Sequence, residues 1–253
     1  MKVLMLVKNS QSSRFVYNSI KNEFDICKII MEPGANKYLL LKRRIKRLGL
    51  GKVLGQLMFQ VLGILALKQF SRKRISSIIE NNHLNNEDFD QSKIIRVNSI
   101  NENKVIDEIN KLNPDIVVVN GTRIISKNVL ESTKAKFMNI HVGITPKYRG
   151  VHGGYWALVN NDYENCGVTV HLIDQGVDTG DIIYQDKIEI TNKDNFLTYP
   201  LLQISKGIDL LKRALKDFEE DKLVFSKNDL DSKLWYHPTL FQYIYNRLLK
   251  EVK

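Results

Sequence analysis

Short apolar runs that alternate with helical patterns are the feature that most constrains the fold of this chain. The sequence opens with an uninterrupted apolar run, Lys2–Val7, and polar residues follow at once. A run without polar alternation is typical of a strand buried on both faces, as in parallel sheets. Later, Asn103–Leu112 carries apolar residues at helical spacing, and Asn113 and Pro114 end that pattern. Strands that alternate with helices predict an α/β fold, Rossmann-like, with a mostly parallel sheet.

The boundaries of the other elements follow from the same patterns. We expect strands at Lys2–Val7, Asp25–Met31, Lys93–Val97, Asp115–Val119, Lys136–Ile140, Gly167–Ile173 and Asp181–Ile190. Ser12 or Ser13 is expected to cap a helix that runs to about Lys21. A long helix is expected from about Asp194 to Glu220, bent or interrupted near Pro200.

The interval 33–82 is too long for an ordinary connection between two strands, so it predicts a helical insertion in the N-terminal half. The chain has 38 basic and 28 acidic residues, and from Lys37 to Arg74 eleven basic residues occur without an acidic one. This local charge favours an anionic partner near the insertion.

Within the insertion, Val53–Leu67 is an apolar run of fifteen residues flanked by basic clusters at both ends. A membrane span needs about 17 to 25 apolar residues, and Gln56 and Gln60 interrupt this run. A helix on a membrane surface stays open, and a buried or oligomer-forming helix is favoured. The apolar run at the N-terminus is too short for a signal peptide, so we expect a cytoplasmic protein, with the inner face of the membrane left open.

Composition and motifs exclude several classes. The 253 residues are 43% hydrophobic, enough for a core without disulfides or metal. The two cysteines, Cys27 and Cys166, lie far apart and outside any CxxC pattern, so we expect two free thiols. The turn after the first predicted strand, Lys8–Ser13, has no glycine, which argues against a nicotinamide or flavin enzyme.

The chemistry is concentrated between Phe137 and Gly180. Asn139 and His141 stand two residues apart at a strand end and therefore project from one face. Asp178 lies in a glycine-rich turn that can approach that face. Taken singly, each residue is more typical of a structural role, such as an Asx turn for the aspartate. Together, an amide, an imidazole and a carboxylate can bind a carbonyl oxygen and move a proton.

The pattern Asn-x-His-x-x-x-x-Pro-x-Tyr-Arg-Gly from Asn139 to Gly150 is followed by Gly-Val-Thr-x-His and Asp-x-Gly-x-Asp-Thr-Gly. This combination resembles the signature of the folate-dependent formyltransferases, most of all those that act on nucleotide-linked sugars. The resemblance covers about Asp115–Gln185 and implies the formyltransferase fold.

The resemblance implies that Asn139, His141 and Asp178 are catalytic. The reaction of the family moves a formyl group from 10-formyltetrahydrofolate to a primary amine and needs no metal. By the mechanism that the resemblance implies, Asn139 and protonated His141 would stabilise the oxyanion of the tetrahedral intermediate. Asp178 would raise the His141 pKa and help to relay the proton from the amine to the folate nitrogen. The folate-binding residues implied by position are Thr122, Ile124, Ile125, Gly143, Ile144 and Asp174.

The chain departs from the family at Gly143 and Thr145, which stand where a Ser-Leu-Leu-Pro sequence is common. His152 and His171 are further imidazoles, and we expect His171, on a strand, to be structural. Tyr155 and Trp156 fit core or interface positions better than base stacking.

The amine acceptor is not fixed by the resemblance. We favour a nucleotide-linked amino sugar of surface polysaccharide (O-antigen or lipopolysaccharide) synthesis, because Tyr148–Trp156 looks most like those enzymes. Methionyl-tRNA is disfavoured, since the C-terminal barrel of its formyltransferases needs about 40 residues and 33 follow the helix predicted to end near Glu220. Glycinamide ribonucleotide is disfavoured by the missing glycine in Lys8–Ser13. A non-catalytic module that binds anions or membranes is the alternative of another class.

The organisation expected is a catalytic domain at 1–220 and a C-terminal extension at 221–253, rich in aromatic residues. Such an extension is expected to pack on the body or on a second subunit. We expect a homodimer, no nucleic-acid partner, and peripheral membrane association through 37–74 as an open possibility. The identity of the sugar and nucleotide is not readable from the sequence.

Overall fold

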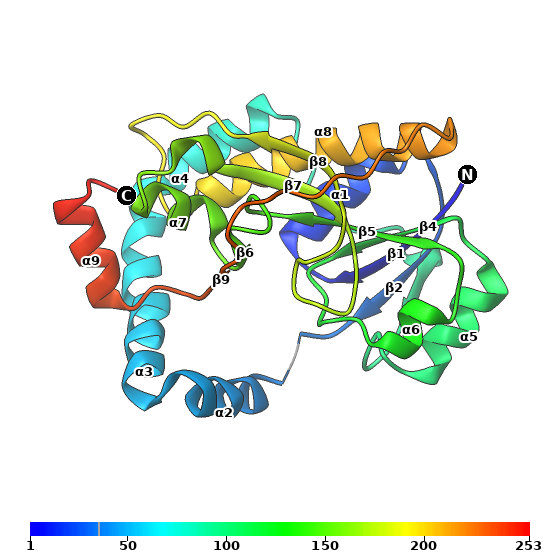
Figure 1. The fold of residues 1–253 in the computed structure, drawn as a ribbon, viewed down its shortest axis with the longest axis horizontal. Helices are drawn as coiled ribbons and strands as arrows, with labels where there is room; N and C mark the ends of the chain where they lie inside the picture. The colour runs from blue at the N-terminus through cyan, green and yellow to red at the C-terminus, as the bar shows by residue number, and fades with distance from the viewer. Residues whose placement is uncertain (35) are drawn as a thin grey trace.

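The fold is seen in a computed structural model, which describes residues 1–34 and 36–253 (Figure 1). Residue 35 falls within the predicted insertion and lies outside the described residues. The strands are β1 (Lys2–Lys8), β2 (Asp25–Glu32), β3 (Ile94–Arg96), β4 (Ile116–Asn120), β5 (Lys136–His141), β6 (Arg149–Gly150), β7 (Gly167–Leu172), β8 (Ile182–Lys187) and β9 (Leu234–Trp235). The α-helices are α1 (Gln11–Ile20), α2 (Lys37–Leu48), α3 (Leu50–Met58), α4 (Ile64–Asn81), α5 (Asn103–Leu112), α6 (Lys127–Glu131), α7 (Gly153–Val159), α8 (Tyr199–Glu219) and α9 (Leu240–Leu249). Three short helical turns complete the list: the π-helical η1 (Phe59–Gly63) and the 3-10 turns η2 (Gln91–Lys93) and η3 (Tyr163–Asn165).

Seven strands form one sheet in the order β3-β2-β1-β4-β5-β7-β8. Strands β1 to β5 are parallel to their neighbours, whereas β7 is antiparallel to both β5 and β8. The predicted α/β fold with a mostly parallel sheet is confirmed.

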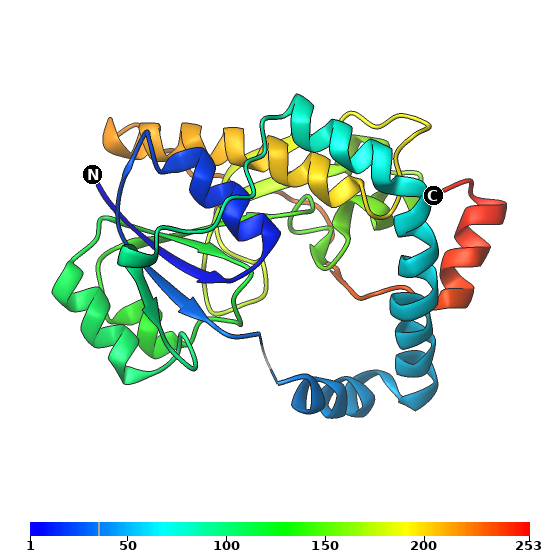
Figure 2. The same ribbon diagram turned by 180° about the vertical axis from the view of Figure 1, so that it is seen from behind.

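Helices cover both faces of this sheet (Figures 1 and 2). Side chains alternate along β1, so Val3 and Met5 join the core under α1 and α8, while Leu4 and Leu6 join the core under α5 and α6. All five residues from Val3 to Val7 are fully buried, as their unbroken apolar pattern predicts.

The predicted insertion is helical. Helices α2 and α3 extend away from the sheet, and α4 returns to the body beside α8 (Figures 1 and 2). Helices α3, η1 and α4 form one continuous helix, Leu50–Asn81, that is long and apolar enough to cross a membrane. Its most apolar window is only 28% buried, so the favoured prediction of a buried helix holds for one face alone.

The C-terminal segment packs on the rest of the chain. Strand β9 pairs with β6, and α9 contacts α3 and η1. Trp235 and Tyr243 join an aromatic cluster with Tyr148, Tyr155 and Phe59, whereas Phe241 and Tyr245 of α9 stay exposed.

Three predicted boundaries are wrong. Helix α1 is capped by Ser10, because Ser12 and Ser13 direct their hydroxyls to the Asn120 side chain instead. Helix α8 begins at Tyr199 and is not bent at Pro200, because proline lacks an N–H and fits the first helical turn. Strand β8 ends at Lys187, three residues earlier than expected.

Candidate active site

A cavity of about 390 Å³ lies where β4 and β5 end, the edge at which parallel α/β sheets place their sites. The loop after β4, the end of β5 and the turn after β7 form its walls. It is lined by Val119, Gly121–Ile125, Asn139–Val142, Gly150, Val151, His171, Ile173, Asp174 and Gly176–Asp178. The three residues predicted to be catalytic are all among them.

The structure brings Asp178 and His141 into direct contact. His141 Nδ1 lies 3.3 Å from Asp178 Oδ2, and His141 Nε2 lies 2.8 Å from the carbonyl oxygen of Tyr148. Asn139 stands two residues before His141 on β5, on the same face of the strand. The predicted amide, imidazole and carboxylate therefore line one wall of the cavity.

Burial dominates the electrostatics of the pair. Burial lowers the pKa of His141, and this outweighs the opposing effects of the Asp178 charge and the Tyr148 carbonyl. The Asp178 charge acts in the expected direction, toward a higher His141 pKa, but burial makes the net shift a lowering. Burial alone would raise the pKa of Asp178, but His141, His171 and the Gly150 amide lower it to about 2.

The contacts of His141 nevertheless suit an imidazole ring that binds a proton and then releases it. Both ring nitrogens face acceptor oxygens, so the protonated ring satisfies both contacts while burial penalises its charge. A proton in this position is well placed for transfer to a group that becomes basic during a reaction.

Asp178 is held in place from the C-terminal part of the chain. Its backbone is left-handed, with φ of 52°, and its Oδ2 accepts a 3.0 Å hydrogen bond from Gly150 N. Gly150 belongs to β6, which pairs with β9, and Val151 N donates to Trp235 O. Residues of the C-terminal segment thus support the carboxylate, a link that no sequence pattern revealed.

His171, which we expect from the sequence to be structural, lines the cavity beside Asn139. It pairs with Asn139 across β5 and β7, and its Nε2 lies 3.2 Å from Asn139 Nδ2. His171 Nδ1 donates to Leu172 O at 2.6 Å, which leaves Nε2 to accept from the amide. Asp178 Oδ1 is 3.7 Å from the same nitrogen. The strand register that creates this contact is not readable from spacing alone.

Four of the six predicted folate-binding residues line the cavity: Thr122, Ile124, Ile125 and Asp174. Asp174 also closes its own turn by accepting from Gly176 N and Thr179 Oγ1.

Gly143 and Ile144 lie outside the cavity lining. A Cβ on Gly143 would lie 2.3 Å from Tyr148 O and 2.8 Å from His141 Nε2, so this glycine permits close packing behind His141. Ile144 is buried against Gly167. Neither residue is in position to touch a ligand in the cavity.

Glu32, which the sequence reasoning missed, fixes the loop after β4. It is buried, and its carboxylate accepts from Arg123 N at 2.7 Å and lies 2.6 Å from Arg123 Nε. Ile100 N donates to the same carboxylate at 3.1 Å. The position of Glu32 at the end of β2, a parallel strand, was the available signal.

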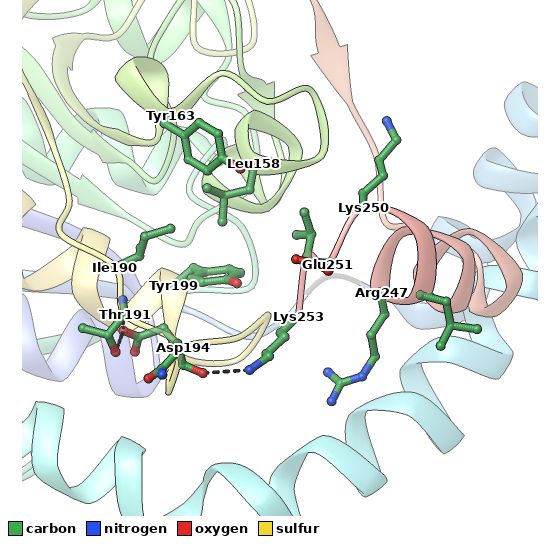
Figure 3. Close-up of a pocket in the computed structure, with 13 residues that line it drawn as sticks. Leu158, Tyr163, Ile190, Thr191, Asp194, Tyr199, Arg247, Lys250, Glu251 and Lys253 are labelled. Atoms are coloured by element: carbon green, nitrogen blue, oxygen red, sulfur yellow. Dashed lines mark hydrogen bonds between the residues drawn. The ribbon is translucent and has the colours of Figure 1, made fainter.

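A second cavity, of about 660 Å³, lies between the segment before α8 and the last residues of the chain (Figure 3). Two of its charged groups have partners within the protein: Asp194 pairs with Arg74, and Lys253 donates to Asn192 O. It shares no residue with the catalytic cavity. Within the described part of the chain, no group of three potential metal ligands gathers, and the two cysteines are free.

Comparison with known proteins agrees with this geometry. A family described as Formyl transferase matches residues 66–200, which is 135 of the 253 residues and includes every residue that lines the cavity. The chain belongs to the formyl transferase family. The predicted resemblance is therefore confirmed.

The family members most similar in sequence include the methionyl-tRNA formyltransferase of Finegoldia magna, which is 38% identical over 128 residues. That match covers 50% of this chain and 41% of the relative, so the chain spans less than half the length of this curated relative.

Solved formyl transferases share the fold over most of this chain. An N-formyltransferase from Helicobacter canadensis, solved with folinic acid and dTDP-3-aminofucose, gives a TM-score of 0.55 at 22% identity and covers 93% of this chain and 71% of its own. Phosphoribosylglycinamide formyltransferase from Anaplasma phagocytophilum gives a TM-score of 0.59 at 13% identity and covers 92% of this chain and 98% of its own. Identities this low show the fold alone.

Proposed function

We propose that this protein transfers a formyl group from 10-formyltetrahydrofolate to the primary amine of a nucleotide-linked amino sugar. The observation that carries the reaction is the placement of Asn139, His141 and Asp178 on one wall of the cavity. The loop after β4, held by the ion pair of Glu32 and Arg123, forms the facing wall.

The cavity suits the folded ring system of a tetrahydrofolate. Backbone groups of Gly121 and Thr122 and the apolar side chains of Ile124 and Ile125 line the wall where the pterin would lie. Backbone donors and acceptors read the edge of such a ring, while aliphatic side chains cover its face. Once bound, the formyl donor supplies an activated carbonyl carbon to the amine.

Asn139 would stabilise the negative oxygen that forms when the amine attacks this carbon. One N–H of its amide is directed to His171, which leaves the second for the oxyanion. A donor that is already oriented by a second hydrogen bond costs little reorganisation during the reaction.

Asp178 and His141 would move the proton. Asp178 is ionised at neutral pH because its pKa is lowered to about 2, so it can attract the proton that the amine loses. His141 holds the other end of this hydrogen bond and can pass a proton to the nitrogen of the formyl donor. The amine adds to the formyl carbon first, and the bond from that carbon to the donor nitrogen breaks when the tetrahedral intermediate collapses. The proton taken up at Asp178 replaces the one that His141 gives to the donor nitrogen, so the charges balance without a metal.

The sugar acceptor is supported by the similarity of Tyr148–Trp156 to sugar N-formyltransferases and by the nucleotide sugar that the Helicobacter canadensis structure contains. Methionyl-tRNA is the second candidate, because it is the substrate named for the curated relatives that share 30 to 38% identity with this chain.

The test is to incubate the purified protein with 10-formyltetrahydrofolate and, separately, a panel of nucleotide-linked amino sugars, methionyl-tRNA and glycinamide ribonucleotide. Release of tetrahydrofolate is followed by absorbance, and the product by a mass increase of one formyl group. We expect turnover with an amino sugar that is lost in Asp178→Asn. Turnover only with methionyl-tRNA would overturn the acceptor, and silence with every amine would overturn the reaction.

A further inference from the structure

The helical insertion presents an apolar surface that the described parts of the protein leave uncovered. Along the continuous helix Leu50–Asn81, six large aliphatic side chains are 42 to 68% exposed. We call them the aliphatic stripe: Leu50, Leu54, Met58, Val61, Leu62 and Leu65. At about 100° per residue, these six positions fall within about one third of the helix circumference, which places them along one side of the helix.

The opposite side of the same helix is fixed to the protein. Val53 and Phe59 are fully buried, and Phe59 packs against Phe196 and Tyr243. Farther along, Arg74 pairs with Asp194 at 2.8 Å. The helix packs on α8 and α9 along this side, and the stripe lies on its open side.

Cations frame the stripe at both ends. Lys42, Arg43 and Lys46 lie on α2, and Lys68, Arg72 and Lys73 follow the stripe on α4. All six are exposed. Helix α2 is described in full, and none of its twelve residues is buried. An isolated helix of this length is marginal in water, which favours an external surface that covers it.

We propose that the aliphatic stripe and its two basic clusters form a docking surface for an anionic phospholipid membrane. A second copy of the chain would cover the stripe but would bring eleven cations against eleven without an acid between Lys37 and Arg74. RNA would neutralise the cations but would leave the aliphatic side chains in water. An anionic bilayer surface satisfies both groups, because its headgroups attract cations and its acyl boundary accepts leucines.

This inference is independent of the proposed function, because no residue of the stripe or of the two clusters lines the catalytic cavity. It places the enzyme at the membrane surface with the helix lying in the interface. A homodimer, which the sequence leads us to expect, would have to use another surface.

The test measures co-sedimentation of the full chain with vesicles of phosphatidylcholine alone or mixed with phosphatidylglycerol, at low and high salt. We expect binding to the anionic vesicles that weakens with salt, and little binding to the neutral ones. Equal binding to both kinds of vesicle would overturn the proposal.

Two triple variants separate the components of the surface. K42Q/R43Q/K46Q removes three cations and is expected to weaken binding by about 100-fold, whereas K104Q/K111Q/K134Q, an equal charge change at exposed sites elsewhere, has a smaller effect. L54S/L62S/L65S is expected to weaken binding about 30-fold or more, and V224S, at an exposed valine elsewhere, leaves binding unchanged.

Analytical ultracentrifugation distinguishes the competing occupant. A wild-type dimer that L54S/L62S/L65S dissociates would show that the stripe is a subunit interface, and the proposal would be wrong. Retained thermal unfolding and far-UV circular dichroism in each variant show that lost binding is not lost folding, since every substituted side chain is exposed.

Discussion

The catalytic cavity and the helical insertion at 37–81 differ in whether their polar and apolar side chains have partners within the protein. We call Asn139, His141, His171 and Asp178 the rim of the cavity. At the rim, imidazoles and a carboxylate are buried, and each has a polar partner within the protein. In the insertion, leucines and cations are exposed, and the acids that would pair with the cations are absent from Lys37 to Arg74.

The contrast separates internal from external recognition. Partners within the protein fix the geometry of the rim, as a reaction at defined atoms requires. The exposed leucines and cations of the insertion instead present a large apolar area beside positive charge. Such a surface suits binding to another broad surface rather than to a small ligand. The family match spans residues 66–200, so it covers the whole rim and leaves α2, α3 and η1 outside.

The C-terminal segment connects the two regions. Trp235 O accepts from Val151 N beside the rim, and His237 O accepts from Gln56 Nε2 in α3 at 2.7 Å. The expected effects below test whether the rim and the insertion can be disturbed separately.

The largest effect is expected for Asp178→Asn, which keeps an acceptor for Gly150 N but removes the charge beside His141. We expect kcat to fall about 1000-fold, because general acid–base catalysis contributes on the order of 10² to 10⁴. The measurement is formation of formylated product, with L54S/L62S/L65S in the insertion as the comparison. A loss below tenfold, or an equal loss in both proteins, would remove the distinction between the regions.

A lower pH is expected to weaken the contact of the C-terminal segment, which connects the rim with the insertion, to the rest of the chain. His152 Nε2 and His237 Nδ1 lie 2.9 Å apart, and burial lowers the pKa of His152 to about 3 and that of His237 to about 4. In the unfolded chain both imidazoles have a pKa near 6.5 and bind protons at pH values where the folded protein keeps them neutral. The stabilisation that is present above pH 6.5 is therefore lost as the pH falls.

For one such ring the free energy of unfolding falls by about 2 kcal/mol between pH 7 and pH 5. Between pH 7 and pH 5, the free energy of unfolding measured with urea should therefore fall by about 2 kcal/mol less in His237→Gln than in the wild type. The exposed His83, substituted in the same way, is the matched control. Parallel pH dependence of all three proteins would contradict the assignment.

His171→Leu tests whether the rim needs more than its three motif residues. Loss of the acceptor for Asn139 Nδ2 leaves the amide less well oriented, and small misplacements cost one to two orders of magnitude in rate. We expect kcat to fall about 30-fold while KM for both substrates stays within about twofold. A change in KM alone would indicate a binding role instead.

The smallest effect is expected at the edge of the cavity. Ile124 is 61% exposed, so Ile124→Ser removes only part of an apolar wall, and KM for the formyl donor should rise about fivefold with kcat unchanged. Val224→Ser, at a valine that is 74% exposed outside the cavity lining, serves as the control. An identical KM in both variants would exclude Ile124 from the donor site.

The sequence by itself determined the parallel sheet, the helical nature of the insertion, and three residues of the rim. Buried strands need continuous apolar runs, and the motif from Asn139 to Gly180 is recognisable because its residues occur together at fixed spacing. These features are local, so residue order is enough to reveal them.

Only the tertiary structure decided the environment of those residues. The contact between His171 and Asn139 depends on the register of two antiparallel strands, and the lowered pKa of His141 depends on how deeply the ring is buried. The support of Asp178 by β6 and β9 joins residues more than fifty positions apart. Which side of Leu50–Asn81 is covered follows from its packing on α8 and α9, because both sides of that helix are apolar in sequence.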